Sequence, residues 1–152
     1  LAVHRLENKK YDLDFVREII EQAAIVYDSK KSAILELGGG VPKNTAQQTG
    51  PLLDQILRRN DGGQNYIIQI TDARPDTGGL SGATLQEGKS WGKIQDSHEG
   101  IVTVYADATI VFPILALYVL SNQKSRKPKR LYKRIGEMYD KLSDDYFKNP
   151  TK

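Results

Sequence analysis

The alternation of strand-like and helical segments is the feature that most constrains how this chain can fold. Branched and aromatic residues dominate three short runs, 32–37, 66–70 and 101–105, as is typical of buried strands. Helical patterns separate these runs. Strands that alternate with helices imply right-handed crossovers and a parallel sheet. The sequence therefore predicts a single α/β domain over residues 1–152, with a Rossmann-like parallel sheet and helices on both faces.

Four segments carry the helical signal. Leu13, Val16, Ile19 and Ile20 begin an apolar stripe at helical spacing, which predicts a helix over residues 11–31 with Asp12 as its cap. Further helices are predicted over residues 45–59 and 131–147. The longest apolar run, 108–120, contains a proline and is too short to cross a bilayer. We expect it to be a buried helix or a helix–strand junction.

Each predicted strand is followed by a loop of unusual composition. Three glycines follow the first strand, a glycine- and proline-rich segment (72–88) follows the second, and Ala106-Asp107 follows the third. The carboxyl ends of parallel strands meet at one edge of a sheet, where ligands bind. The length of segment 72–88 also favours a functional loop. The three loops are therefore predicted to converge on one site.

The glycine segment Gly38-Gly39-Gly40 allows two interpretations. Glycines let backbone amides approach a phosphate or a ribose, and the following helix favours anions. The segment is neither a Gly-x-Gly-x-x-Gly fingerprint nor a P-loop, so a simple tight turn explains it equally well. Asp107 likewise either accepts a hydrogen bond from a ribose hydroxyl or caps the next helix.

Lys93 stands beside Trp91 and Gly92, which is unusual chemistry for the end of a loop. Contact with aromatic surface removes water from around a lysine and disfavours its ammonium form. The free amine then becomes a nucleophile that forms imines. The alternative is a surface lysine whose stem packs on the indole. Asp72, Asp76 and Glu87 bracket the preceding loop, and such carboxylates either hold the ammonium groups of a polyamine or are simply solvated.

Composition excludes several kinds of site. The chain has no cysteine, which rules out disulfides, thiolate catalysis and cysteine-ligated metals. His4 and His98 lie far apart, which argues against a histidine-rich metal site or a His-based triad. A carboxylate metal site stays open, but no residue is assigned to a metal. The net charge of +3 is concentrated in segment 124–134, which we interpret as a solvated linker and not as a nucleic-acid surface. No signal peptide opens the chain and no segment spans a membrane, so we expect a cytoplasmic location.

Taken together, these stretches resemble the deoxyhypusine synthase family. The order and spacing of the motifs match from about residue 32 to about residue 120. The matching motifs are Gly38-Gly39-Gly40-Val41-Pro42-Lys43, Ser81-Gly82-Ala83, Glu87, Ser90-Trp91-Gly92-Lys93-Ile94, and Tyr105-Ala106-Asp107-Ala108 through Phe112-Pro113.

The resemblance implies an NAD-dependent transfer of an aminobutyl group from spermidine to an acceptor amine. Lys93 would hold the butyl group as a covalent imine, Trp91 would pack along the polyamine, and Glu87 would bind one of its ammonium groups. Asn44 and Ser81 fall in the family's substrate-binding motifs. Family members are usually tetramers whose active sites are shared between subunits. By the same resemblance, the NAD site would be lined by Gly38, Gly39, Gly40, Asp72, Ala73, Ala106 and Asp107.

Two substitutions depart from the family pattern. Asn44 stands where eukaryotic and archaeal members have a histidine, and asparagine cannot take up a proton as imidazole can. Leu80 replaces an aspartate that binds the polyamine. Both changes resemble the bacterial deoxyhypusine-synthase-like branch, which implies a small acceptor such as putrescine, with homospermidine as the product, in preference to a protein lysine.

The chain is also about half the length of family members and corresponds to their C-terminal half, which is half of a deoxyhypusine-synthase-type NAD-binding domain. We therefore expect an N-terminal-half companion chain or segment, since half a sheet leaves apolar surface uncovered. Two other functions stay open beside the enzyme. One is a non-catalytic subunit, which Asn44 and Leu80 allow, and the other is a scaffold that binds NAD without forming a lysine adduct.

Overall fold

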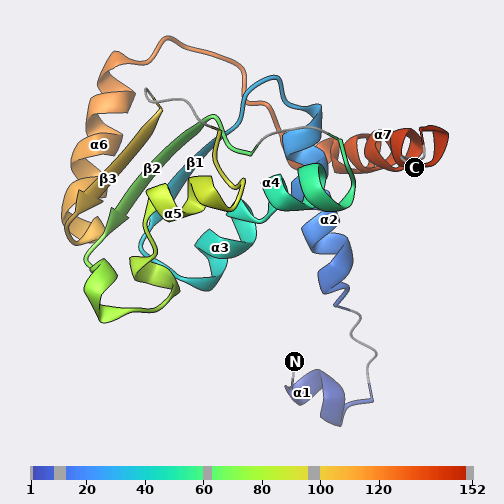
Figure 1. Ribbon diagram of the computed structural model, residues 1–152, viewed down its shortest axis with the longest axis horizontal. Helices are drawn as coiled ribbons and strands as arrows, with labels where there is room; N and C mark the ends of the chain where they lie inside the picture. The colour runs from blue at the N-terminus through green and yellow to red at the C-terminus, as the bar shows by residue number, and fades with distance from the viewer. Residues whose placement is uncertain (1, 9–12, 60–62, 96–99, 150–152) are drawn as a thin grey trace.

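The computed structural model describes residues 2–8, 13–59, 63–95 and 100–149. At its centre lies a three-stranded parallel sheet with the strand order β1-β2-β3 (Figure 1). The strands are β1 (Ala33–Leu37), β2 (Tyr66–Thr71) and β3 (Ile101–Tyr105). They confirm the three predicted strands to within one residue at each end.

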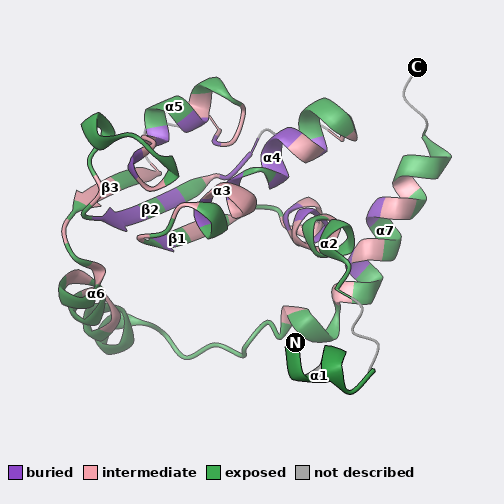
Figure 2. Cartoon of the chain, turned by 90° about the horizontal axis from the view of Figure 1, so that it is seen from below, coloured by how far each residue is buried: buried purple, intermediate pink, exposed green. Residues whose placement is uncertain are grey.

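Helices cover both faces of this sheet, which confirms the predicted Rossmann-like α/β class. Helices α3 (Val41–Gln47) and α5 (Leu85–Ser90) lie on one face, and α6 (Ala108–Asn122) lies on the other (Figure 2). The two faces differ in how well they are covered. We call the side under α3 and α5 the inner face, and the side under α6 the outer face.

On the inner face, side chains from all three strands form rows across the sheet. Ile67 is aligned with Ile34 and Ile101 by the strand register, and it packs against Leu85 and Ile94 in a small apolar core. One step further along the strands, a polar row replaces the apolar one. Glu36 and Gln69, which pair in register, are both buried there. The inner face therefore brings polar groups under α3.

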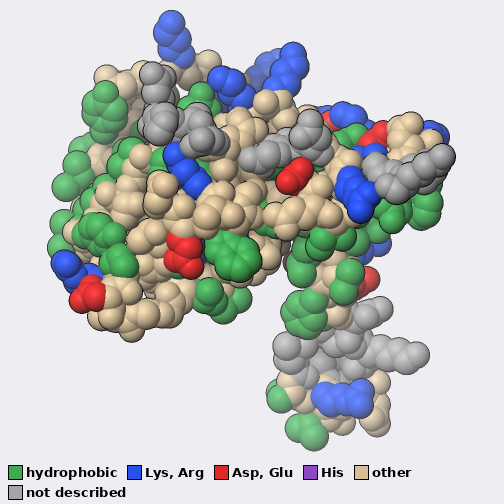
Figure 3. Space-filling model, viewed as in Figure 1, with side chains coloured by type: hydrophobic (Ala, Val, Ile, Leu, Met, Phe, Trp, Pro, Cys, Tyr) green, Lys and Arg blue, Asp and Glu red, His purple; other side chains and the backbone are tan. Residues whose placement is uncertain are grey.

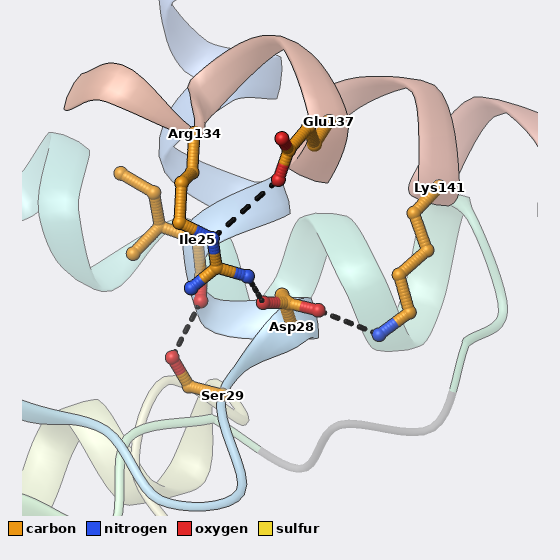
Figure 4. Close-up of polar contacts among 6 residues, drawn as sticks. All are labelled: Ile25, Asp28, Ser29, Arg134, Glu137 and Lys141. Carbon is orange, nitrogen blue, oxygen red and sulfur yellow. Dashed lines mark hydrogen bonds and ion pairs between the residues drawn. The ribbon is translucent and has the colours of Figure 1, made fainter. Parts of the chain in front are cut away.

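A second core lies beside the sheet, between α2 (Phe15–Asp28) and α7 (Ile135–Lys148). At its edge Asp28 accepts hydrogen bonds from Lys141 (2.6 Å) and Arg134 (3.3 Å), so that the end of α2 is joined to α7 (Figure 4). The hydrogen bond from Lys141 is the main cause that lowers the pKa of Asp28. The buried members of this core are Ala23, Ala24, Val26, Leu53, Met138 and Leu142.

The helix predicted over residues 45–59 begins earlier and is divided. It starts at Val41, because Pro42 suits the first turn of a helix, where its missing N–H costs nothing. Pro51 then interrupts the hydrogen-bond ladder. The segment accordingly continues as a short turn, α4 (Thr49–Pro51), and a π-helical turn (Leu52–Ile56).

The helices predicted over residues 11–31 and 131–147 are present as α2 and α7, but their ends differ from the prediction. Helix α2 begins at Phe15, and its cap is Asp14, whose carboxylate accepts the Arg17 N–H at 2.9 Å. Asp12, the predicted cap, lies outside the described residues. Helix α7 starts only at Ile135, after a 3₁₀ turn (Leu131–Lys133). A short helix that was not predicted, α1 (Ala2–Leu6), precedes α2.

The apolar run 108–120 does form a helix, α6, but its predicted burial is wrong for this chain. None of the residues of α6 is buried, because no described element packs over its outward side. Figure 3 shows hydrophobic side chains gathered at the surface over α6, at the left of the molecule. On the outer face of the sheet Leu35, Ile68 and Val102 are exposed as well. Both α6 and the outer face of the sheet therefore leave apolar side chains exposed.

The basic segment after α6 behaves as the predicted linker over residues 124–130, all of which are exposed and lie outside helices and strands. Within the described ranges, no helix has the length and apolarity that crossing a membrane requires.

Replacement of Leu142 by alanine tests the α2–α7 core. Leu142 is only 2% exposed, so the substitution removes buried methyl groups and leaves a cavity. We expect the free energy of unfolding to fall by about 2–5 kcal/mol, measured by urea denaturation. The matched control is Leu6→Ala, at a leucine that is 84% exposed, with an expected change below about 0.5 kcal/mol. Equal effects of the two substitutions would contradict this packing.

Candidate functional site

The parallel sheet brings the three predicted loops to one edge. The Gly38 N–H donates to the Ile70 carbonyl (2.7 Å), and the Ala106 N–H donates to the Thr71 carbonyl (3.1 Å). The glycine turn and the Ala106-Asp107 turn therefore flank the end of β2, from which Asp72 follows directly. The predicted convergence of these loops is confirmed.

The glycine turn needs glycines for two reasons. Gly38 and Gly39 have φ values of +59° and +73°, which other residues adopt only with strain. At Gly40 the reason is a close approach, since a Cβ atom there would lie 3.0 Å from the Leu80 Cβ and 3.3 Å from the Ser81 Oγ. The turn is thereby packed against the segment that contains Leu80 and Ser81.

Two exposed carboxylates, Asp72 and Asp107, stand at this edge. Asp107 caps α6: its Oδ1 accepts both the N–H (2.8 Å) and the hydroxyl (2.7 Å) of Thr109. The hydrogen bond from the Thr109 hydroxyl is the main cause that lowers the pKa of Asp107. Of its two predicted roles, helix capping is thus observed. Nearby, the Ala73 N–H donates to the Thr71 hydroxyl at 3.1 Å.

The edge combines open space with glycine backbone and carboxylates. A side chain at Gly38 would meet no heavy atom within 4 Å, so open space lies in front of the turn. Carboxylates such as Asp72 and Asp107 accept hydrogen bonds from ribose hydroxyls, and glycine backbone allows a phosphate to come close. The predicted cofactor residues are therefore together, and binding of NAD by them stays a prediction.

Segment 72–88 is more structured than the predicted loop. It contains two 3₁₀ turns (Pro75–Thr77 and Leu80–Gly82) and then enters α5 at Leu85. The Thr84 hydroxyl accepts the Glu87 N–H at 3.1 Å and so caps this helix. The sequence contained the signal, because a threonine followed three residues later by a glutamate is the pattern of a capping box.

Between α3 and α5 lies a cavity of about 270 Å³. It brings together four of the predicted site residues: Lys93, Trp91, Glu87 and Asn44. The Lys93 Nζ donates to the Asn44 Oδ1 at 2.7 Å, so the residue that replaces the expected histidine contacts the predicted nucleophile directly. Trp91 is 62% exposed at the cavity, which leaves its ring accessible to a ligand.

Ser81 lies apart from these four residues. It is not among the residues that line the cavity, and its hydroxyl is directed toward Gly40. Its carbonyl accepts a hydrogen bond from the buried Gln69 amide at 3.3 Å. In this chain Ser81 therefore supports the glycine turn, while a contact with substrate stays a prediction.

A pair of buried charged residues that the sequence did not predict, Lys43 and Glu36, lies below the cavity. Lys43 is 6% exposed, lines the cavity, and donates to the Ala83 carbonyl at 2.8 Å. Glu36 is 4% exposed and accepts a hydrogen bond from Gln47 at 2.5 Å. Burial raises the pKa of Glu36 and lowers the pKa of Lys43. The sequence did contain a signal for this site, because Glu36 is a charged residue within the otherwise apolar strand β1.

The chain is similar to known proteins over most of its length. A family model described as deoxyhypusine synthase matches residues 1–119. A deoxyhypusine synthase-like protein of Nostoc sp. is 45% identical to this chain, and the match covers 96% of this chain and 39% of the relative. A deoxyhypusine synthase-like protein of Thermosynechococcus vestitus is 44% identical, and the match covers 96% of this chain and 38% of the relative. A probable deoxyhypusine synthase 2 of Methanosarcina acetivorans is 41% identical over 76% of this chain and 33% of its own length. The chain thus spans less than half the length of these curated relatives.

Replacement of Gly82 by alanine tests the turn that shapes the cavity. The added Cβ would lie 2.5 Å from the Arg74 carbonyl oxygen, so the backbone must move. We expect a loss of about 1–3 kcal/mol in the free energy of unfolding, measured by chemical denaturation. Gly136→Ala is the matched control, since a Cβ there meets nothing within 4 Å, and it is expected to be neutral or to stabilise by up to about 1 kcal/mol. A neutral Gly82→Ala variant would show that the turn adopts a different shape.

Proposed function

This chain belongs to the deoxyhypusine synthase family, and we propose that it is the catalytic half of an enzyme that transfers an aminobutyl group from spermidine to an acceptor amine. One observation carries the proposal. A lysine, an accessible indole and a carboxylate, from Lys93, Trp91 and Glu87, share one cavity beside the open edge of the sheet.

Lys93 is proposed as the nucleophile. Once the substrate carbon is oxidised to an imine, the Lys93 amine adds to that carbon and diaminopropane leaves, so that the butyl group is held on Lys93 as a new imine. The acceptor amine then adds to the same carbon and Lys93 is released. Before the attack, the hydrogen bond to the Asn44 Oδ1 holds the Lys93 Nζ at the cavity.

Trp91 and Glu87 are proposed to hold the polyamine. The exposed indole offers a π-face over which a methylene chain or an ammonium group can lie. Glu87 sits in the first turn of α5, where the Thr84 cap fixes the backbone, and its carboxylate is an anionic partner for one ammonium group.

NAD is proposed as the cofactor, and when bound it supplies the redox chemistry that oxidises the amine and later reduces the product imine. The residues proposed to hold it are those of the sheet edge: Gly38, Gly39, Gly40, Asp72, Ala73, Ala106 and Asp107. Their shared position at the carboxyl ends of the strands supports this assignment.

A small amine such as putrescine is proposed as the acceptor, which makes homospermidine the product. Leu80 lines the cavity where the family's pattern has an aspartate. Among the residues that the structure describes, Glu87 is then the one acidic side chain of the cavity that can bind an ammonium group. The relatives at 44–45% identity are named deoxyhypusine synthase-like proteins, which agrees with a branch distinct from the deoxyhypusine synthases.

A non-catalytic subunit is the second candidate, and Asn44 is the observation that favours it. Asparagine occupies the position beside Lys93 where a titrating histidine would be expected, and it cannot exchange a proton. Such a subunit would keep the fold and bind NAD without ever forming an adduct on Lys93.

The apolar surface of α6 and the outer face of the sheet is proposed to bind the rest of the family fold, either as a companion chain or as a further segment. A helix that is apolar on all sides is normally buried, and α6 has no buried residue here. The relatives are more than twice as long as this chain, so a polypeptide of suitable size exists in the family. The complete unit is proposed to form a tetramer.

Trapping of the imine tests the enzymatic function. The protein that carries this chain is incubated with NAD and spermidine, reduced with borohydride and analysed by intact mass. We expect an aminobutyl adduct that Lys93→Ala abolishes, because the attacking amine is gone. Lys127→Ala, at an exposed lysine of the linker, is the control and should keep the adduct.

The absence of any adduct from protein that binds NAD and contains its companion would favour the non-catalytic subunit. An adduct that persists in Lys93→Ala would place the chemistry on another residue.

Leu117→Asp tests the proposed docking surface. Leu117 is exposed on α6, and a carboxylate there would be buried without a partner if the companion covers this helix. We expect the companion to be lost on co-purification, or the unfolding midpoint to fall where both halves form one polypeptide. Phe147→Asp, at an exposed position on α7, is the control. Identical behaviour of the two variants would exclude α6 as the covered surface.

A further inference from the structure

We propose that Lys43 accepts the proton that Lys93 must lose before it can attack, and that it thereby takes over the role of the absent histidine. This inference rests on the proposed transfer through Lys93. A protonated amine has no lone pair, so nucleophilic attack by Lys93 requires a base at the cavity. Asn44, the side chain nearest to Lys93 in the hydrogen-bond network, cannot serve, because an amide does not titrate.

Lys43 is the candidate base among the ionisable side chains that line the cavity. In the described parts of the chain, the other ionisable side chains at the cavity are Lys93 itself and Glu87. Glu87 is exposed and is proposed to be occupied by a substrate ammonium group. Lys43 is almost fully buried, directly precedes Asn44 on α3, and lines the same cavity as Lys93.

The surroundings of Lys43 allow it to exist with or without the extra proton. Burial is the largest cause that lowers its pKa, and the positive charge of Lys93, which follows α5, lowers it further. The carboxylates of Glu36 on β1 and of Glu87 on α5 act in the opposite direction. The Ala83 carbonyl, 2.8 Å from Nζ, accepts a hydrogen bond from either the neutral amine or the ammonium ion.

Glu36 is a positioning residue for this step. Its carboxylate is buried behind Gln47, and its Oε2 has no hydrogen-bond partner among the described residues. The buried negative charge of Glu36 stabilises the ammonium form of Lys43 after Lys43 has accepted a proton. In the balanced step, one proton passes from the Lys93 ammonium to the Lys43 amine. Lys43 then returns that proton to the amine that leaves.

The titration of Lys43 is measured first, because it does not depend on activity. Lysine labelled with ¹³C at Cε is followed by NMR across pH, and Lys43 is assigned from the signal that disappears in Lys43→Arg. We expect Lys43 to titrate at a lower pH than the exposed Lys127. In Glu36→Gln the titration should move lower still, because the carboxylate that raises the pKa of Lys43 is gone. Titration of Lys43 together with the exposed lysines would overturn the proposal.

The second measurement is the pH dependence of adduct formation on Lys93 in the whole protein. The rate should fall on the acidic side as Lys43 becomes protonated, and Glu36→Gln should move this limb to lower pH. Lys43→Arg keeps the positive charge but cannot act as a base, so we expect a rate loss of about 10²–10⁴-fold and no such limb. Lys127→Arg is the control and should leave the profile unchanged.

These outcomes separate the two proposals. Wild-type protein that binds NAD and forms no adduct would overturn the transfer itself, and the role of Lys43 with it. An adduct whose pH limb is unchanged in both Lys43→Arg and Glu36→Gln would overturn the role of Lys43 alone. Because Glu36→Gln nearly preserves shape, it decides the question even where Lys43→Arg lowers the thermal stability.

Discussion

Parallel pairing of β1, β2 and β3 is the constraint on which the candidate site depends. In register, Leu37 pairs with Ile70, and Thr71 pairs with Tyr105, so all three strands end at the same edge. An antiparallel strand would have sent one loop to the opposite edge. The glycine turn, Asp72 and the Ala106-Asp107 turn are neighbours because of this pairing, and a Cβ atom at Gly38 would meet open space.

The two faces of the sheet differ in the chemistry and the burial of their side chains. The inner face buries a polar row that includes Glu36 and Gln69. Glu36 accepts a hydrogen bond from Gln47, which lines the cavity, and Gln69 donates to the Ser81 carbonyl beside the glycine turn. The outer face and α6 are apolar and exposed instead. Burial of a polar group costs free energy unless the group is hydrogen-bonded, and an exposed apolar surface of this kind is typical of an interaction surface.

Much of the fold could be predicted, and the errors share a cause. Strands and the larger helices were found because apolar periodicity marks them directly. The early start at Val41 and the helix α5 were missed because both depend on single residues, Pro42 and the Thr84 cap, in segments that otherwise appear irregular. The predicted burial of α6 was wrong for this chain. An apolar sequence predicts that a helix is buried, but it does not identify the element that packs against the helix.

The sequence by itself determined the α/β class, the convergence of three loops, and the motif around Lys93 that resembles deoxyhypusine synthase, since these follow from patterns along the chain. Only the tertiary structure decided which groups meet. It placed Asn44 against Lys93 and Ser81 against Gly40, and it buried Lys43 near Glu36. Contacts between residues far apart in the chain, and the desolvation that shifts the pKa of Lys43, arise from packing, and no local pattern encodes them.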